Sequence, residues 1–231
     1  YNQFISKIQL ADTSGARSMI WSLADEKYTP VQHSMHNVIG LSYVRKSLEF
    51  NLEGYYKTFN GISRYSTNDT LINSERISGY GYGVDFFSKL RIKKHEVILS
   101  YSLGQFNEQT DSKLSSSAIT EPEQSQQHEI KASLNLWFRP ITISIAGVYG
   151  SGFKSFSLKN EGEIKPYSRI DIALKYTKKL KKTSMNTGVS ILNLLNTSNV
   201  RLFRTTNFSD NSSYSTLGLP FTPTLFFNLN F

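Results

Sequence analysis

A two-residue alternation of apolar and polar side chains runs through most of the chain and leaves no convincing helix. It is clearest at 48–57, 130–138, 141–150 and 170–176, where every second residue is apolar or small and the residues between them are mainly polar or small. Successive side chains of a strand point to opposite faces, so each segment has one apolar and one more polar face. The pattern predicts an all-β chain.

The connections between these segments alternate in length. Short connections are followed by long ones rich in Ser, Asn, Asp and Glu. The short ones lie at 45–47, 91–94, 139–140 and 178–183, and the long ones at about 66–76, 106–126, 151–166 and 208–217. This order predicts an antiparallel up-and-down meander with short turns at one rim and long loops at the other.

Such a meander is either a soluble sandwich, whose apolar face fills a core, or a transmembrane β-barrel, whose apolar face meets lipid. The apolar bands of about 9–11 residues match strands that cross a bilayer and exceed the usual 5–6 residues of soluble strands. Aromatic residues stand near the ends of the apolar faces, at Tyr43, Tyr101, Phe138, Tyr149 and Tyr176. These features favour the barrel, and the low charged fraction of 19% agrees with it.

Composition excludes several other classes. The chain has no Cys, which excludes a disulfide scaffold, a thiolate zinc site and a Cys nucleophile. Aromatic residues make up 13%, too many for a disordered chain. The longest apolar runs span about five residues, too few for a membrane helix.

The last segment carries a candidate signal for barrel insertion. Leu225, Phe227, Leu229 and Phe231 share one strand face, and the chain ends on Phe. A terminal Phe preceded by alternating apolar residues resembles the signal by which the barrel assembly machinery recognises outer-membrane barrels. The plainer interpretation is an ordinary edge strand at the end of a sheet.

Several phrases resemble the C-terminal part of a TonB-dependent outer-membrane transporter. They are Ser47–Ile62, which reads SLEFNLEGYYKTFNGI, Gly79–Leu90 with its Gly-aromatic pattern, and His128–Ala132, which reads HEIKA. Gly188–Asn196 ends in NLLN, and Thr222–Asn228 reads TPTLFFN. The resemblance covers nearly the whole chain.

The resemblance implies a barrel of about 22 strands around a plug. Residues 1–10 have the pattern of one further strand, so 1–231 are expected to form roughly the last ten strands, with the plug and earlier strands absent from this chain. Nine complete strands are predicted near 35–45, 47–65, 77–91, 94–106, 127–138, 140–152, 166–178, 183–206 and 218–231.

The resemblance also implies a function. Transporters of this kind import scarce bulky nutrients such as iron chelates, cobalamin or glycans through the outer membrane, powered through TonB. The expected partners are outer-membrane lipid and lipopolysaccharide, the protein's own plug, the TonB complex through the missing part, and a surface lipoprotein. No cofactor and no catalytic residue are expected.

The polar strand faces supply the candidate site residues. By alternation they point into the lumen, where they would line a substrate path or contact the plug. The alternative is that they pair across strands and solvate the barrel wall. These residues are Glu49, Asn51, Glu53, Asp85, Lys89, Glu129, Lys131, Asn135, Arg169, Asp171 and Lys175.

Histidines offer weak candidates. His33 and His36 have a spacing that binds metal on a helix, but this region is predicted to be extended, which separates the rings. His95 lies by a short turn. His128 with Glu121 or Glu123 is the arrangement that an outer-membrane enzyme would need. Polar rim residues are the simpler interpretation, and no metal site is expected.

Basic residues concentrate in the short turns. Such a stripe can indicate nucleic acid, but recurrence at one rim of a meander favours solvated periplasmic turns, and no nucleic-acid partner is expected. Four bases near the outer strand ends are predicted to meet lipopolysaccharide phosphates: Arg64, Arg76, Arg201 and Arg204.

Three alternatives to a transporter follow from the same pattern. The chain would be a small self-contained barrel acting as an adhesin or structural protein, an outer-membrane enzyme, or a barrel fragment held on an insertion machine.

Overall fold

All regular elements that the structure describes are β-strands. The computed structural model describes residues 5–11, 17–23, 30–68, 71–111, 119–120, 122, 125–152, 154–157, 160–163, 165–181, 183–207 and 212–230. Within these ranges there is no helix long and apolar enough to cross a membrane.

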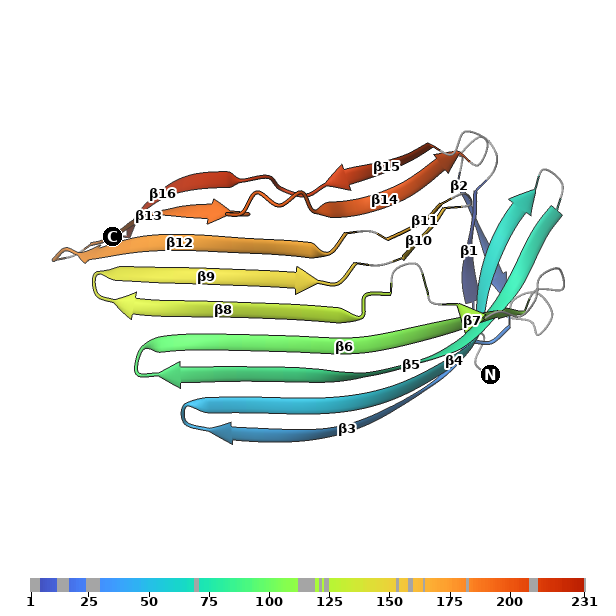
Figure 1. The fold of residues 1–231 in the computed structure, drawn as a ribbon, viewed down its shortest axis with the longest axis horizontal. Helices are drawn as coiled ribbons and strands as arrows, with labels where there is room; N and C mark the ends of the chain where they lie inside the picture. Colours follow the sequence, from blue (N-terminus) through green and yellow to red (C-terminus); the bar gives the residue numbers. More distant parts are fainter. Residues whose placement is uncertain are drawn as a thin grey trace. The chain divides into compact units, whose positions relative to one another are not determined.

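Nine strands follow one another in one antiparallel up-and-down sheet, in the order β3-β4-β5-β6-β8-β9-β12-β13-β16 (Figure 1). Their bounds are β3 His33–Arg45, β4 Leu48–Asn68, β5 Leu71–Ile92, β6 His95–Asp111, β8 His128–Phe138, β9 Ile141–Gly150, β12 Tyr167–Lys179, β13 Ser184–Leu192 and β16 Thr222–Asn230. The two-residue β7 (Ile119–Thr120) pairs with β6.

Three further hairpins form separate two-stranded sheets. They are β1 (Ile5–Ala11) with β2 (Arg17–Leu23), β10 (Lys154–Ser157) with β11 (Asn160–Glu163), and β14 (Val200–Asn207) with β15 (Ser212–Leu217). The prediction of an all-β antiparallel meander with nine successive strands is therefore confirmed.

Three details of the predicted meander are wrong. The segment 183–206 is not one strand, because β13 stops at Leu192 and β14 begins at Val200. The strand expected at 1–10 pairs with β2 in a hairpin of its own and does not extend the main sheet. The loop expected at 66–76 is mostly strand, since β4 runs to Asn68 and β5 starts at Leu71. The residues at these strand ends are mostly polar, so their composition resembles that of a loop.

The chain divides into two compact units. One comprises 1–38, 55–82 and 105–122, and the other 39–54, 83–104 and 123–231. The second unit contains β8, β9, β12, β13 and β16 with all four short connections.

Strand register in the second unit sorts the side chains into rows of one kind. One row across five strands is entirely apolar: Leu136, Ile143, Leu174, Val189 and Leu225. The adjacent row is polar or small: Asn135, Ser144, Ala173, Ser190 and Thr224. Neighbouring rows point to opposite faces, so the two-residue pattern of single strands becomes an apolar and a polar face of a whole sheet.

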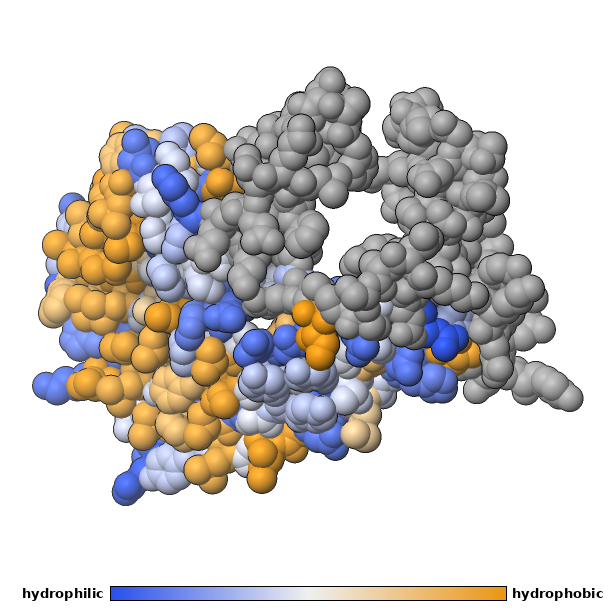
Figure 2. Space-filling model, turned by 45° about the vertical axis from the view of Figure 1, so that its right-hand side comes forward, coloured by the Kyte–Doolittle hydropathy of each residue, from blue (hydrophilic) through white to orange (hydrophobic). Residues whose placement is uncertain are grey.

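The apolar face of this unit is largely exposed. Leu225 is 83% exposed, Phe227 63% and Leu174 44%. Among the described residues, by contrast, the buried apolar core consists of Ile77. Figure 2 shows a broad hydrophobic surface at the left of the view, with hydrophilic residues projecting from its edge. No second layer of the described residues covers this face as it would in a soluble sandwich.

The short connections lie at one edge of the sheet, at the left in Figure 1. Lys46-Ser47, Lys93-Lys94 and Arg139-Pro140 are two-residue turns, and 180–183 joins β12 to β13. Lys93 has a positive φ of 55°, a conformation that Asn and Gly adopt at lower cost than Lys.

The lack of a side chain at Gly188 leaves space for the aromatic ring of Phe226. A Cβ at this position would lie 2.6 Å from Cζ of Phe226 on β16 and would meet the backbone oxygen of Leu174 on β12. At Gly147 on β9, by contrast, a Cβ would have no neighbour within 4 Å.

We expect Gly188→Ala to destabilise the sheet by about 1–3 kcal/mol, because an added methyl group would displace Phe226 and strain the ladder. Gly147→Ala is the matched control and should be neutral or stabilising by up to about 1 kcal/mol, since it restricts the unfolded chain without a clash. Denaturant titration of the two variants measures the difference. Equal stability of both variants would contradict the packing described for Phe226.

Candidate functional site: the polar face and the pocket of the first unit

The predicted site residues lie on four strands and do not form a catalytic cluster. Glu49, Asn51 and Glu53 lie on β4, Asp85 and Lys89 on β5, Glu129, Lys131 and Asn135 on β8, and Arg169, Asp171 and Lys175 on β12. Glu53, Lys131 and Lys175 are exposed and the others are half-buried. Whether this face meets a plug or a substrate stays a prediction.

Charges on this face are paired with each other. Arg169 donates two hydrogen bonds of 2.8 Å to Asp171, and Lys131 Nζ lies 2.6 Å from Glu129 Oε1. These pairs run along a strand, between residues i and i+2. The cross-strand pairs involve Glu96, which contacts Lys89 at 3.2 Å and Arg91 at 3.0 Å. Ion pairs near the surface add little to stability, so these pairs mainly limit unpaired charge on this face.

Asn135 is held by a neutral hydrogen bond. Ser144 Oγ donates to Asn135 Oδ1 at 2.7 Å, across the β8–β9 ladder. The same arrangement recurs between β12 and β13, where Thr177 Oγ1 donates to Asn186 Oδ1 at 2.8 Å. The polar face thus satisfies part of its own hydrogen-bonding capacity.

A buried asparagine terminates β13 and connects it to the polar face. Asn193 is fully buried and has φ of 51°, and its backbone N–H donates to Asp171 Oδ1 at 2.8 Å. Its side-chain amide donates to the carbonyls of Thr197 and Leu219, both at 2.9 Å, and its Oδ1 accepts from Thr197 N at 3.1 Å. One side chain therefore holds the turn and the entry to β16.

Asn199 fixes the other end of this turn. It is 4% exposed, and its side-chain amide donates to the carbonyl of Ser168 at 2.8 Å while its Oδ1 accepts from Ser168 N at 2.9 Å. This pair of bonds imitates a strand ladder beside β12. Asn193 and Asn199 were not among the predicted site residues; the phrase Asn193-Leu-Leu-Asn196 was noted only as part of the family resemblance.

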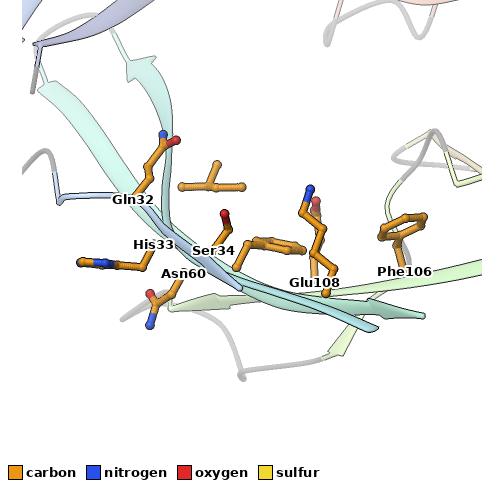
Figure 3. A pocket seen from close by; sticks show the side chains of 9 residues that line it. Gln32, His33, Ser34, Asn60, Phe106 and Glu108 are labelled. Carbon is orange, nitrogen blue, oxygen red and sulfur yellow. The ribbon is translucent and has the colours of Figure 1, made fainter. Parts of the chain in front are cut away.

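The first unit contains a pocket of about 520 Å³. It is lined by Gln32, His33, Ser34, Lys57, Phe59, Asn60, Ile62, Phe106 and Glu108. The labelled side chains lie on two sides of the ribbons (Figure 3). One side carries Gln32, Ser34, Phe106 and Glu108, and the other carries His33 and Asn60. Its volume lies within the range usual for small-molecule sites.

Two glycines of β5 make room for the pocket's aromatic rings. A Cβ at Gly79 would lie 2.5 Å from Cζ of Phe59 on β4, and a Cβ at Gly81 would meet the ring of Phe106 on β6. The two rings therefore pack against glycines of β5, Phe59 from β4 and Phe106 from β6. The Gly-aromatic spacing of 79–90 did not show in the sequence that Phe106 would pack against Gly81.

The histidines make local contacts. Tyr101 Oη lies 3.0 Å from His128 Nδ1, and the two rings are stacked. Glu121 and Glu123, the acids suggested as partners of His128, lie outside the described residues. His33 and His36 both lie on β3, where residues three apart point to opposite faces. Among the described residues no three His, Asp or Glu side chains form a metal-binding group.

The residues of the candidate insertion signal lie on β16 or beside it. Leu225, Phe227 and Leu229 are all exposed, and they pair in register with Val189, Thr187 and Met185 of β13. Phe231 lies outside the described residues.

Comparison with known proteins shows a likeness of fold. No protein-family model matches the chain, and no curated protein sequence is significantly similar to it. The structure is similar to the crystal structure of BauA, the ferric preacinetobactin receptor from Acinetobacter baumannii, with a TM-score of 0.57 and 13% sequence identity. The match covers 96% of this chain and 32% of the receptor, so the chain spans about a third of the receptor's length.

We expect Asn193→Asp to destabilise the sheet by about 1–3 kcal/mol or more, because a carboxylate would face the carbonyls of Thr197 and Leu219 without a proton to donate. Asn230→Asp is the matched control, since Asn230 is exposed and its side chain makes a single long hydrogen bond of 3.4 Å to Ser184. Denaturant titration measures both, and equal losses would contradict the role of Asn193.

Proposed function

We propose that the chain is the C-terminal part of the transmembrane β-barrel of a TonB-dependent outer-membrane transporter, which imports a scarce bulky nutrient such as an iron chelate, cobalamin or a glycan. The plug, the earlier strands and the segment that meets TonB would belong to a longer protein. The protein's location would be the outer membrane, and no covalent chemistry is assigned to it.

The exposed apolar face carries the membrane part of this proposal. A sheet that leaves Leu174 44%, Phe227 63% and Leu225 83% exposed loses the contribution of about 25 cal/mol for each Å² of apolar surface left in water. Lipid covers such a face without a second protein layer, and closure of the sheet into a barrel removes its open edges. This arrangement accounts for the near absence of an apolar core among the described residues.

The transport part rests on the likeness of fold to a ferric preacinetobactin receptor and on the sequence phrases that resemble those of TonB-dependent transporters. The polar face, with charges already paired to one another, suits a wall that a plug or a hydrated path can touch without a large desolvation cost. We assign plug contact to the exposed members of this face, Glu53, Lys131 and Lys175.

The pocket of the first unit is proposed to contact the substrate. Phe59 and Phe106 offer apolar ring surface, while Gln32, Ser34, Lys57 and Glu108 offer polar groups beside them. A mixed lining of this kind suits a bulky ligand that has both ring systems and oxygen atoms.

We expect Ser34→Trp to lower nutrient uptake at least about tenfold, because an indole would fill much of the pocket. Met35→Trp is the matched control, since Met35 on β3 is 56% exposed and does not line the pocket, so its replacement should preserve uptake. The assay measures depletion of candidate iron chelates, cobalamin and glycans from the medium by cells that express each variant at equal surface levels.

Uptake should also disappear when the gene is deleted and when a protonophore collapses the inner-membrane gradient. Unchanged depletion in the deletion strain would overturn the transport proposal, and a defect limited to adhesion would favour a structural barrel instead. Equal uptake by the two Trp variants would remove the pocket from the substrate path and leave the transporter proposal intact.

A further inference from the structure

The positive charge of the chain is concentrated in one place. The four short connections, at 45–47, 91–94, 139–140 and 178–183, hold ten of the 26 Lys and Arg residues and none of the 18 Asp and Glu residues. The rest of the chain, with 16 basic and 18 acidic residues, is slightly acidic. These ten basic residues form the basic rim: Arg45, Lys46, Arg91, Lys93, Lys94, Arg139, Lys178, Lys179, Lys181 and Lys182.

The basic rim is exposed and mostly unpaired. Nine of its members have described side chains, and all nine are exposed. Arg91 contacts Glu96, whereas the other eight make no ion pair within the part of the chain that the structure describes. Charges that needed only to keep a turn soluble could have either sign. The four short connections contain no acid, and Glu96 beside them pairs with Arg91, so the excess of positive charge favours a partner of negative charge.

A row of four aromatic or apolar side chains and one threonine lies directly inside the basic rim. Phe138 and Tyr176 are both register partners of Ile141, and Tyr176 pairs with Thr187, which pairs with Phe227. Phe138 is 53% exposed and precedes Arg139; Tyr176 is 38% exposed and lies two residues before Lys178. Aromatic rings followed by cations at the edge of an apolar band match the depth profile of a bilayer interface.

The backbone of one turn supports the same conclusion. Lys93 occupies a left-handed position where Asn or Gly would be easier to accommodate, and it is followed by Lys94. A two-residue turn that only closes the hairpin would favour Asn or Gly at this position. We therefore attribute the Lys at position 93 to a role of its positive charge.

We propose that the basic rim binds the headgroups of anionic phospholipids in the leaflet on the short-turn side. This inference rests on the proposed membrane location and adds the class of lipid and the residues that select it. Lys and Arg bind phosphate through charge-assisted hydrogen bonds, and a ring of them beside apolar surface binds lipid more strongly when the headgroup is anionic.

The test uses the protein in the form in which cells make it, reconstituted into phosphatidylcholine bilayers with a trace of spin-labelled phosphatidylglycerol or phosphatidylcholine. The fraction of motionally restricted label gives the relative affinity for each lipid. We expect a preference of about threefold for phosphatidylglycerol at about 0.1 M salt, falling towards one at about 1 M salt.

The rim variant Lys94→Gln, Lys178→Gln, Lys181→Gln should lose at least half of this preference. The matched control is Lys57→Gln, Lys165→Gln, Lys175→Gln, which removes the same charge from exposed lysines outside the basic rim and should keep it.

A wild-type preference of one, or equal losses in the rim and control variants, would overturn the inference while leaving the membrane location intact. A preference that survives 1 M salt would also overturn it, because it would not be electrostatic. If neither label is restricted, the protein has no lipid boundary, and it is the proposed function that fails.

Discussion

Strand register is the constraint on which the rest of this structure depends. A slip of one residue in any strand would exchange its apolar and polar sides, and rows such as Leu136–Ile143–Leu174 would be broken by serines and asparagines. Short two-residue turns hold the register at one edge, because they leave no slack between neighbouring strands. The turn around Asn193 holds it near the other end of β13, through hydrogen bonds to Asp171 and Leu219.

This constraint links the two faces of the sheet. The ladder that aligns Leu174 with Val189 also aligns Ala173 with Ser190, so an apolar surface and a polar surface arise together from one set of backbone hydrogen bonds. The polar side then pairs its own charges, as Arg169 does with Asp171. The excess of positive charge lies in the basic rim, at the edge of the sheet and outside its apolar and polar faces.

Period-two alternation located the nine strands of the main sheet, although it continued the strand from 183 past Leu192, because it reports directly which side of a strand each residue faces. The alternating lengths of the connections predicted the order of the strands and the short turns. It failed where a single residue acts against the pattern. Asn193 ends a strand through a left-handed backbone and a buried amide, which alternation does not register. Polar composition was also misleading: the stretch 66–76 resembles a loop, although β4 runs to Asn68 and β5 starts at Leu71. The packing of Phe226 against Gly188 and of Phe106 against Gly81 could not be predicted either. It depends on which residues are neighbours across strands, and only the register of the structure shows this.

The central claim is that the apolar face of the sheet meets lipid. It is tested most directly by tryptophan quenching in bilayers of lipids brominated on their acyl chains, after Trp21→Phe and Trp137→Phe remove the native signals. Leu174→Trp and Ala173→Trp are adjacent on β12 and belong to the apolar and the polar row. We predict strong quenching for Leu174→Trp and little for Ala173→Trp. Weak quenching at both positions, or equal quenching at both, would show that lipid does not cover this face.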